Sequence, residues 1–317
     1  MTAARLGPAL DALPPISLDE LIERASLQTR FDRKYVLPVD TVGALLEQLP
    51  AGTRVLEIGE SRSFSYRSLY FDTPDLVSYL LAAQRRRRRF KIRTRVYEES
   101  AQCWLEVKTQ GGRGDTVKER LPYELDDHAT LGPGREFVDT TLSTHRITGS
   151  HAFHFVPVLT TRYQRTTLHL PDTDSRVTID TGLVWADGER EIRLSDTAVV
   201  ETKTGSTASG FDRLLWSNHW RPARISKFAT GLAALRPELP SAPWRRTLRR
   251  NFPPDSGRPA PADRTADREP GPGGERGGPA GRTAEPDRER RRDLDRDPDR
   301  SRERQEAQNC LDAVMTS

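Results

Sequence analysis

The chain has 317 residues, of which 35% are hydrophobic and 30% charged, and its formal net charge at pH 7 is +4. Runs of 18 apolar residues are absent, which excludes a membrane-spanning helix, and the two cysteines, Cys103 and Cys310, exclude a disulfide framework. Because residues 1–13 lack the apolar core of a secretory signal, we expect a soluble cytoplasmic protein.

The polar composition is concentrated at the C-terminal end of the chain. Residues 251–317 contain 9 Pro, 7 Gly, 13 Arg and 15 Asp or Glu, with one aromatic residue, Phe252. Such a segment cannot bury enough apolar surface to offset its conformational entropy, so we predict a disordered tail. We therefore expect a flexible N-terminus at 1–14, one folded domain at 15–250 and the tail at 251–317. Without the tail, the net charge rises to 4 − (13 − 15) = +6.

Caps, alternation and turn residues predict the elements of this domain. In chain order they are a helix at 17–25, a strand at 30–37, a helix at 40–49, a strand at 63–72, a helix at 73–83, strands at 89–97, 102–108 and 116–125, a helix at 136–147, strands at 156–170, 176–180 and 198–204, and helices at 207–220 and 227–235. Strands dominate and follow one another in runs, which indicates an α+β protein with an antiparallel sheet.

Five of these strands carry charge on one face and apolar side chains on the other, because side chains alternate along a strand. The clearest case is 89–97, where four cations share one face. The charged faces contain Arg89, Lys91, Arg93 and Arg95; Glu106 and Lys108; Lys118 and Arg120; Arg176 and Asp180; and Glu201 and Lys203.

An ordinary sheet with one solvated face is the simplest interpretation of such alternation. Two features favour a basic tunnel or deep groove instead. Four cations lie on one strand face, and like charges on neighbouring strands repel unless an anion neutralises them. A closed barrel with a polar interior would hold such an anion. Moreover, all six lysines of the chain lie outside the tail, in predicted strands or at strand ends.

The chemistry of this face indicates a ligand with many negative charges, such as a nucleoside triphosphate or polyphosphate. Carboxylates among phosphates need a divalent metal, so Glu106, Asp180 and Glu201 are candidate ligands for Mg²⁺ or Mn²⁺, with Asp32 as a further carboxylate. Walker A, G-x-G-x-x-G and kinase motifs are absent from the sequence. Nucleic acid is not expected, because few aromatic residues accompany the cations.

These residues resemble the VTC domain, the polyphosphate polymerase domain of the vacuolar transporter chaperone complex, in the triphosphate tunnel metalloenzyme superfamily. The resemblance spans about residues 26–236. The matching pieces are Arg30-Phe-Asp-Arg-Lys-Tyr35, Ser68-Leu-Tyr-Phe-Asp72, Arg89-Phe-Lys-Ile-Arg-Thr-Arg95 with Tyr97, Leu105-Glu-Val-Lys108, Lys118-Glu-Arg120, Tyr163-Gln-Arg165, Arg176-Val-Thr-Ile-Asp180, Val200-Glu-Thr-Lys203 and Arg224-Ile-Ser-Lys227. The resemblance implies an eight-stranded antiparallel β-barrel tunnel with a basic interior, flanked by helices.

The resemblance also implies roles for individual residues. Phosphate contacts would come from Lys34, Arg93, Arg95, Lys108, Arg165, Arg176 and Lys203, and a metal contact from Glu201. Arg224 and Lys227 match a basic pair at the tunnel wall, although Arg224 stands where a lysine is expected. With the charged-face residues added, we expect catalysis by Arg93, Arg95, Arg165, Arg176 and Lys203, substrate binding by Lys34, Lys91, Lys108, Lys118, Arg120, Arg224 and Lys227, and metal binding by Glu106, Asp180 and Glu201.

Three functions remain open at this stage. The expected one is transfer of the γ-phosphate of ATP to a polyphosphate chain with a divalent metal, Mn²⁺ or Mg²⁺. A triphosphate hydrolase in the same tunnel is the first alternative. The hydrolytic branches begin with E-x-E-x-K, whereas this strand reads Arg30-x-Asp32-x-Lys34, which favours the polymerase branch. A non-catalytic polyphosphate-binding module is the second alternative, but it would have no need of the carboxylates.

Overall fold

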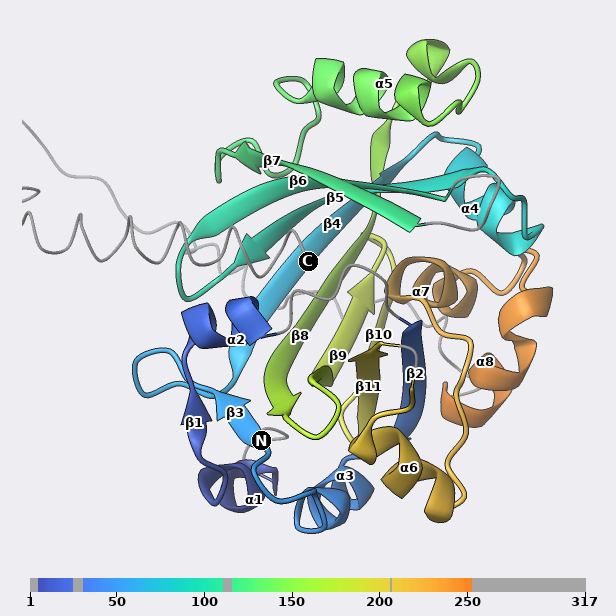
Figure 1. Ribbon diagram of the computed structural model, residues 1–317. Coiled ribbons are helices and arrows are strands. Elements are labelled where there is room, and N and C mark those ends of the chain that lie inside the picture. The colour runs from blue at the N-terminus through green and yellow to red at the C-terminus, as the bar shows by residue number, and fades with distance from the viewer. Residues whose placement is uncertain (1–4, 25–30, 111–115, 206, 253–317) are drawn as a thin grey trace, which may run out of the picture.

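The computed structural model describes residues 5–24, 31–110, 116–205 and 207–252, and one bent antiparallel sheet dominates it (Figure 1). Eight strands follow one another by hydrogen bonding in the order β2-β11-β9-β8-β4-β5-β6-β7. Their bounds are β2 (Phe31–Pro38), β4 (Phe64–Asp72), β5 (Arg89–Tyr97), β6 (Gln102–Gln110), β7 (Thr116–Tyr123), β8 (Val156–Leu170), β9 (Ser175–Ala186) and β11 (Thr197–Thr204). The predicted α+β class with its antiparallel sheet is confirmed.

The sheet bends so that its two halves cross. In Figure 1, β4–β7 form an upper wing, and β8, β9, β11 and β2 form a lower wing. Within the described residues, pairing does not join β7 to β2, so the predicted barrel is an open groove with two edges. The expectation of closure was wrong in this respect, because hydrogen bonding ends at β2 on one side and β7 on the other. The eight-stranded path itself is as predicted.

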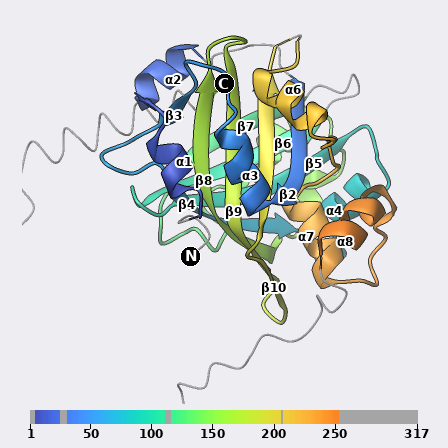
Figure 2. The ribbon, with the colours of Figure 1, turned by 90° about the horizontal axis from the view of Figure 1, so that it is seen from below.

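Helices cover the outer surface of both wings and one end of the groove. Their bounds are α1 (Gly7–Asp11), α2 (Leu18–Arg24), α3 (Val39–Leu46), α4 (Val77–Ala83), α5 (Arg135–Thr144), α6 (Gly210–Ser217), α7 (Lys227–Leu235) and α8 (Arg245–Asn251), with 3₁₀ turns η2 (Ser150–Ala152) and η3 (Ala242–Trp244). Seen from below, α3 and α6 lie over the lower wing (Figure 2). In this way the apolar faces of the strands are buried and the charged faces turn inward.

Three short strands were not expected from the sequence. β1 (Pro15–Ile16) pairs with β3 (Arg54–Leu56), β3 pairs with β8, and β10 (Glu191–Leu194) pairs with β9. They have two to four residues each, too few for alternation to be recognised. They extend the lower wing without altering the path of the eight strands.

The ends of the folded region differ from the predicted boundaries. Residues 1–14 were expected to be flexible, but α1 forms within them and the side chains of Leu6 and Leu10 are buried against the lower wing. This part of the prediction was wrong, because two leucines at i and i+4 suffice to dock one helical turn. At the other end, the ring of Phe252 contacts Trp185, with ring centroids 5.4 Å apart. The predicted tail from residue 253 onward lies outside the described residues.

Helix α7 closes one end of the groove. All of its residues except Lys227 are buried, which suits a helix that is apolar on every side. Phe228 stacks on Tyr70, with ring centroids 5.2 Å apart, so this end of the inner face is an apolar core. Gly231 allows the close approach, because a Cβ atom there would lie 2.2 Å from the ring of Trp185. The charged part of the inner face begins next to this apolar contact between α7 and the sheet.

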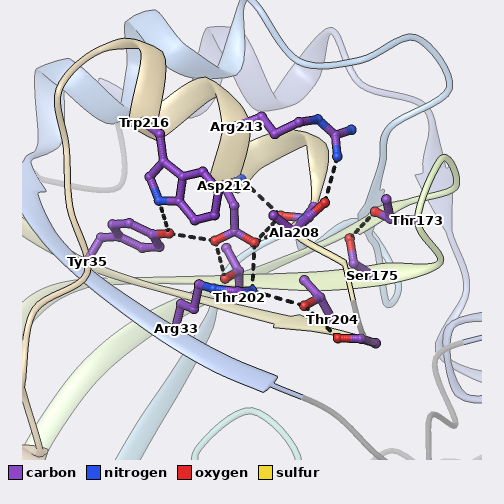
Figure 3. Close-up of polar contacts among 12 residues, drawn as sticks. Arg33, Tyr35, Thr173, Ser175, Thr202, Thr204, Ala208, Asp212, Arg213 and Trp216 are labelled. Carbon is purple, nitrogen blue, oxygen red and sulfur yellow. Dashed lines mark hydrogen bonds and ion pairs between the residues drawn. The ribbon is translucent and has the colours of Figure 1, made fainter.

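On the outer surface, a buried carboxylate fixes α6 against the sheet (Figure 3). Asp212 is fully buried, and its Oδ1 accepts hydrogen bonds of 2.7 Å from Tyr35 of β2 and Thr202 of β11. Its Oδ2 accepts from the backbone N–H and the hydroxyl of Ser209, the N-cap of the helix. Since Tyr35 and Thr202 alternate with Lys34 and Glu201, this network sets the position of the inward-facing side chains next to them.

Helices long and apolar enough to cross a membrane are absent from the described part of the chain.

Candidate functional site

The strand register brings the predicted charged residues onto one continuous face. Residues that pair across antiparallel strands point to the same side of the sheet. Arg93 pairs with Glu106, and Glu106 in turn with Arg120; on the lower wing, Arg165 pairs with Asp180. The inward set is Asp32, Lys34, Arg89, Lys91, Arg93, Arg95, Glu106, Lys108, Lys118, Arg120, Arg165, Arg176, Asp180, Glu201 and Lys203.

The two wings face each other across the groove. Lys91 of β5 lies close enough to Lys34 of β2 for their charges to interact, and Lys108 of β6 does the same with Lys203 of β11. These strand pairs are far apart along the path of the sheet. The charged side chains therefore surround one space rather than lining two separate surfaces, which favours the groove over the solvated face considered above.

On the upper wing, a single carboxylate lies among many cations. Arg93 donates to Glu106 from Nε at 2.6 Å, and its Nη2 also contacts that carboxylate. Burial would raise the pKa of Glu106, but Arg93 and Arg95 hold it well below the usual value, so the side chain is ionised. Lys118 is 3.9 Å away from Oε1 of Glu106, beyond hydrogen-bond distance. The upper wing thus carries a large excess of positive charge.

Three lysines of this wing have lowered pKa values. Burial, together with Lys34 and Arg93, lowers the pKa of Lys91 to about 8. Burial and neighbouring arginines lower the pKa of Lys118 to about 8 as well, although Glu106 partly offsets them. For Lys108, burial and Arg93 lower the pKa well below its usual value. A buried ammonium among cations is unfavourable, and an anion placed between them would restore its pKa.

On the lower wing, cations and carboxylates are paired. Arg165 forms two hydrogen bonds with Asp180, of 2.6 and 2.9 Å, and Lys227 from α7 contacts the same carboxylate. Burial would raise the pKa of Asp180, but these two cations lower it to about 2. Lys34 lies 2.5 Å from Glu201, and with Lys203 it keeps the pKa of Glu201 well below the usual value. This half of the site, with Arg176 and Lys203 included, still carries more cations than carboxylates, but its excess of positive charge is smaller than that of the upper wing.

Arg176 and Lys203 pair across β9 and β11 and lie on the inner face beyond Glu201. Arg176 is only 6% exposed, and both residues have partners in the structure. Arg120 stacks over the indole of Trp104 at 4.4 Å. These three predicted residues therefore belong to the same face as the others.

Arg224 and Lys227 were both predicted to bind substrate, but they lie in different surroundings. Arg224 is exposed in the segment before α7, and its backbone oxygen accepts a hydrogen bond from Thr247. Among the described residues, no hydrogen bond or ion pair joins the Arg224 side chain to the inward set, whereas Lys227 contacts Asp180 in the groove. Arg224 lies before α7, which begins at Lys227, so no helical spacing places the two side chains on one face.

Tyrosines beneath the arginines were not singled out by sequence reasoning. Tyr163 accepts a hydrogen bond of 3.0 Å from Arg95, and its ring lies 4.2 Å from Nζ of Lys227. Burial would raise the pKa of Tyr163, but Arg95 and Arg165 lower it. Tyr70 accepts from Arg93 at 3.0 Å, and Tyr66 lies under Arg165. Their alternation in the strands at 63–72 and 156–170 was the available signal.

The carboxylates do not form a ready-made metal cluster. Within the described residues, groups of three or more His, Cys, Asp or Glu side chains that could hold a metal ion are absent. Asp180 fits a metal ion poorly, because both of its oxygens already contact cations. Glu106 could supply one oxygen ligand to a metal ion, because its buried Oε1 has no hydrogen-bond partner among the described residues. Glu106 and Glu201 could hold a divalent ion only together with phosphate oxygens.

Comparison with known proteins gives a family match and several distant likenesses in fold. The family model for the VTC domain matches residues 29–236. A search of curated proteins finds no match.

Solved structures with a similar fold include three cyclase candidates. One from Bacillus halodurans is 17% identical, with a TM-score of 0.42, covering 63% of this chain and 94% of its own. One from Vibrio parahaemolyticus is 11% identical, with a TM-score of 0.39, covering 65% and 98%. A third, HpAC1 from Hippeastrum, is described as having a dominant triphosphatase activity; it is 15% identical, with a TM-score of 0.40, covering 65% and 96%.

Proposed function

Because this chain belongs to the VTC domain family, we propose that it transfers the γ-phosphate of ATP to the end of a polyphosphate chain held in the groove. One observation carries the proposal: Lys91, Lys108 and Lys118 are half-buried among arginines and have lowered pKa values. The inner face is therefore electrostatically incomplete until a polyanion lies on it. Linear phosphates supply closely spaced negative charges that match cations projecting from successive strands.

In the proposed reaction, a terminal oxygen of the polyphosphate attacks the γ-phosphorus of ATP. The new P–O bond forms as the bond between the γ-phosphorus and the β,γ-bridging oxygen breaks, and ADP leaves with that oxygen's electron pair. Since the attacking phosphate is ionised at neutral pH, the reaction needs no general base. Its requirements are alignment of the two phosphates and neutralisation of charge.

The side chains of the groove would divide these tasks. Arg93 and Arg95 extend from the upper wing, and Arg165 from the lower wing, so they can contact the transferred phosphate from two sides. Tyr70 and Tyr163, which accept hydrogen bonds from Arg93 and Arg95, hold the guanidinium groups in place. Lys34, Arg176 and Lys203 would bind neighbouring phosphates, and Lys91, Lys108, Lys118 and Arg120 those along the upper wing.

A divalent ion, Mn²⁺ or Mg²⁺, would further neutralise the phosphates if bound to Glu106 or Glu201. Both carboxylates are ionised at neutral pH, which a metal ligand requires. Because each is next to a cation, the ion would gain most of its ligands from the phosphates themselves. Glu201 also fixes Nζ of Lys34, so it orients a phosphate-binding ammonium with or without the ion.

The test is incubation of the purified protein with ATP and either Mn²⁺ or Mg²⁺, followed by gel electrophoresis and phosphorus NMR. Ladders of increasing chain length with stoichiometric ADP would support polymerisation. Orthophosphate without ladders would instead identify a triphosphate hydrolase that uses water as the nucleophile. Tight, salt-sensitive binding of polyphosphate without ATP turnover would identify a binding module.

A further inference from the structure

An exposed basic surface lies next to the β5 end of the groove. Residues 84–88 connect α4 to β5, directly before Arg89 and Lys91, which point inward. All four of Arg85, Arg86, Arg87 and Arg88 are exposed. Arg146, after α5, is exposed too. We call these five arginines the basic shoulder.

The connecting turn is held by its own hydrogen bonds. The backbone N–H of Arg85 donates to Ala82 and that of Arg86 donates to Leu81, while Arg85 takes a left-handed conformation with φ 54°. Arg89 also donates from its side chain to the backbone oxygen of Arg86. The exposed arginines therefore lie on an ordered turn. Arg89, the first inward-facing residue of β5, contacts Arg86 in this turn.

The shoulder borders a hollow of about 800 Å³ outside the groove. Arg88, Arg146 and His151 line it together with hydroxyl-bearing residues of α5 and the segment that follows, among them Ser143 and Thr144. One carboxylate, Asp139, also lines it, but Oδ2 of Asp139 accepts a hydrogen bond of 2.8 Å from Arg135. The lining combines cations with hydroxyl donors, a chemistry that suits phosphate oxygens.

The charges of the shoulder have no carboxylate partner among the described residues. Within the described part of the chain, ion pairs to Arg85–Arg88 or Arg146 are absent, whereas Arg135, Arg162 and Arg213 each have a carboxylate partner. The excess positive charge of the upper wing thus continues around the end of β5 onto the outer surface. A ligand that lies only in the groove would not contact the positive charges of the shoulder.

We propose that the basic shoulder binds the part of a polyphosphate chain that extends out of the groove past Lys91. The inference rests on the proposed function, because it takes a linear polyphosphate as the occupant of the groove. Only a chain longer than the groove can reach both Lys91 and Arg146. The shoulder therefore provides affinity for long chains and none for triphosphate, and it keeps the growing product bound between transfers.

The experiment compares wild-type protein with R88E/R146E and with the control R213E/R221E, which makes the same change of charge at or after α6 on the lower wing. Fluorescence anisotropy would measure binding of triphosphate and of a polyphosphate of many tens of phosphates over a range of salt concentrations. We expect R88E/R146E to weaken long-chain binding by roughly tenfold or more and to reduce the salt slope by about two. Triphosphate binding should change by less than twofold, and the control should resemble wild type.

Equal loss of affinity for triphosphate and long chains, or no loss for either, would overturn the inference. The same holds if a single-stranded oligonucleotide loses as much affinity as polyphosphate, since the shoulder would then be a nucleic-acid surface. Because these measurements need no turnover, they are separate from the test of the proposed function. A protein that makes no polyphosphate could still bind long chains through the shoulder, and an active polymerase could lack this preference.

Discussion

The two wings of the sheet present the same types of side chain to the groove but differ in how those charges are compensated. On the lower wing, Asp180 is bound by Arg165 and Lys227, and Glu201 by Lys34. On the upper wing, Glu106 is the single inward-facing carboxylate among seven inward-facing cations of β5, β6 and β7. The lower wing is thus a pre-formed framework with the smaller excess of positive charge, whereas the upper wing needs an anion from outside.

The difference shows that cations lining a site need not share one role. A cation paired with a carboxylate is already stabilised and mainly fixes geometry, whereas an uncompensated cation contributes most when the ligand arrives. We therefore assign the strongest contribution to anion binding to the upper wing. The following predictions test that division, beginning with the largest expected effect.

Replacement of Arg93 by alanine should produce the largest change. It removes a guanidinium that faces the transferred phosphate and leaves Glu106 without its main partner. We expect the rate of phosphoryl transfer from ATP to fall by roughly 10²–10³-fold. The control is R67A, because Arg67 lies on the opposite face of the neighbouring strand β4. Equal rates for R93A and wild type would show that Arg93 does not contribute to phosphoryl transfer.

Replacement of Glu201 by glutamine tests the framework of the lower wing. The substitution keeps the shape of the side chain but removes the charge that fixes Lys34 and that could contact a metal ion. We expect turnover to fall about 10–100-fold with triphosphate affinity unchanged or higher, because the groove gains net positive charge. Steady-state rates at several Mn²⁺ concentrations, with calorimetry for binding, separate the two quantities. Weaker triphosphate binding by E201Q would contradict the division between wings.

The pH dependence of binding tests the lysines of the upper wing. Lys91 and Lys118 have pKa values of about 8 in the free protein, and a bound anion raises them. Triphosphate affinity should be nearly constant below pH 8 and fall as the pH rises above it, by up to about tenfold per lysine and pH unit. Calorimetry in buffers of different ionisation enthalpy should detect proton uptake on binding at pH 9. In K118M the decrease should be smaller, and an unchanged slope would show that Lys118 does not titrate there.

The smallest effect concerns the stability of the ligand-free protein. A lysine whose pKa is lowered on folding destabilises the folded state fully below that pKa, and the penalty disappears as the pH rises through the unfolded value. K118M should therefore raise the unfolding free energy at pH 7 by about 1–2 kcal/mol, and the gain should shrink towards pH 10. Thermal unfolding with and without triphosphate measures it. A gain that does not change with pH would assign it to packing instead of charge.

Much of the site could be predicted from the strands alone. Alternation in 89–97 assigns Arg93 and Arg95 to one face regardless of the neighbouring strand, because the side-chain period of a strand is fixed by backbone geometry. Helix α7 could not be placed in the same way. Its apolar sequence indicates burial on every side, but not that Phe228 would stack on Tyr70 and close one end of the groove.

The roles of the carboxylates needed the three-dimensional structure as well. Asp180 and Glu201 look equivalent in the sequence, since each is a carboxylate on the charged face of an alternating strand. Only packing brings Lys227, from a helix 47 residues away, onto Asp180, so that cations contact both oxygens of this carboxylate. The contacts between the tyrosines and the arginines also needed the three-dimensional structure, because they join residues of different strands.

By itself, the sequence determined the class of fold, the common strand face of the cations and the family to which the chain belongs, since each depends on local periodicity or on motifs of a few residues. Tertiary structure alone decided which cations are compensated, where the groove ends and that the sheet remains open between β2 and β7. Those properties arise from charges and backbone groups that approach each other only after folding. Coulomb interactions and hydrogen bonds depend on distance in space, whatever the separation along the chain.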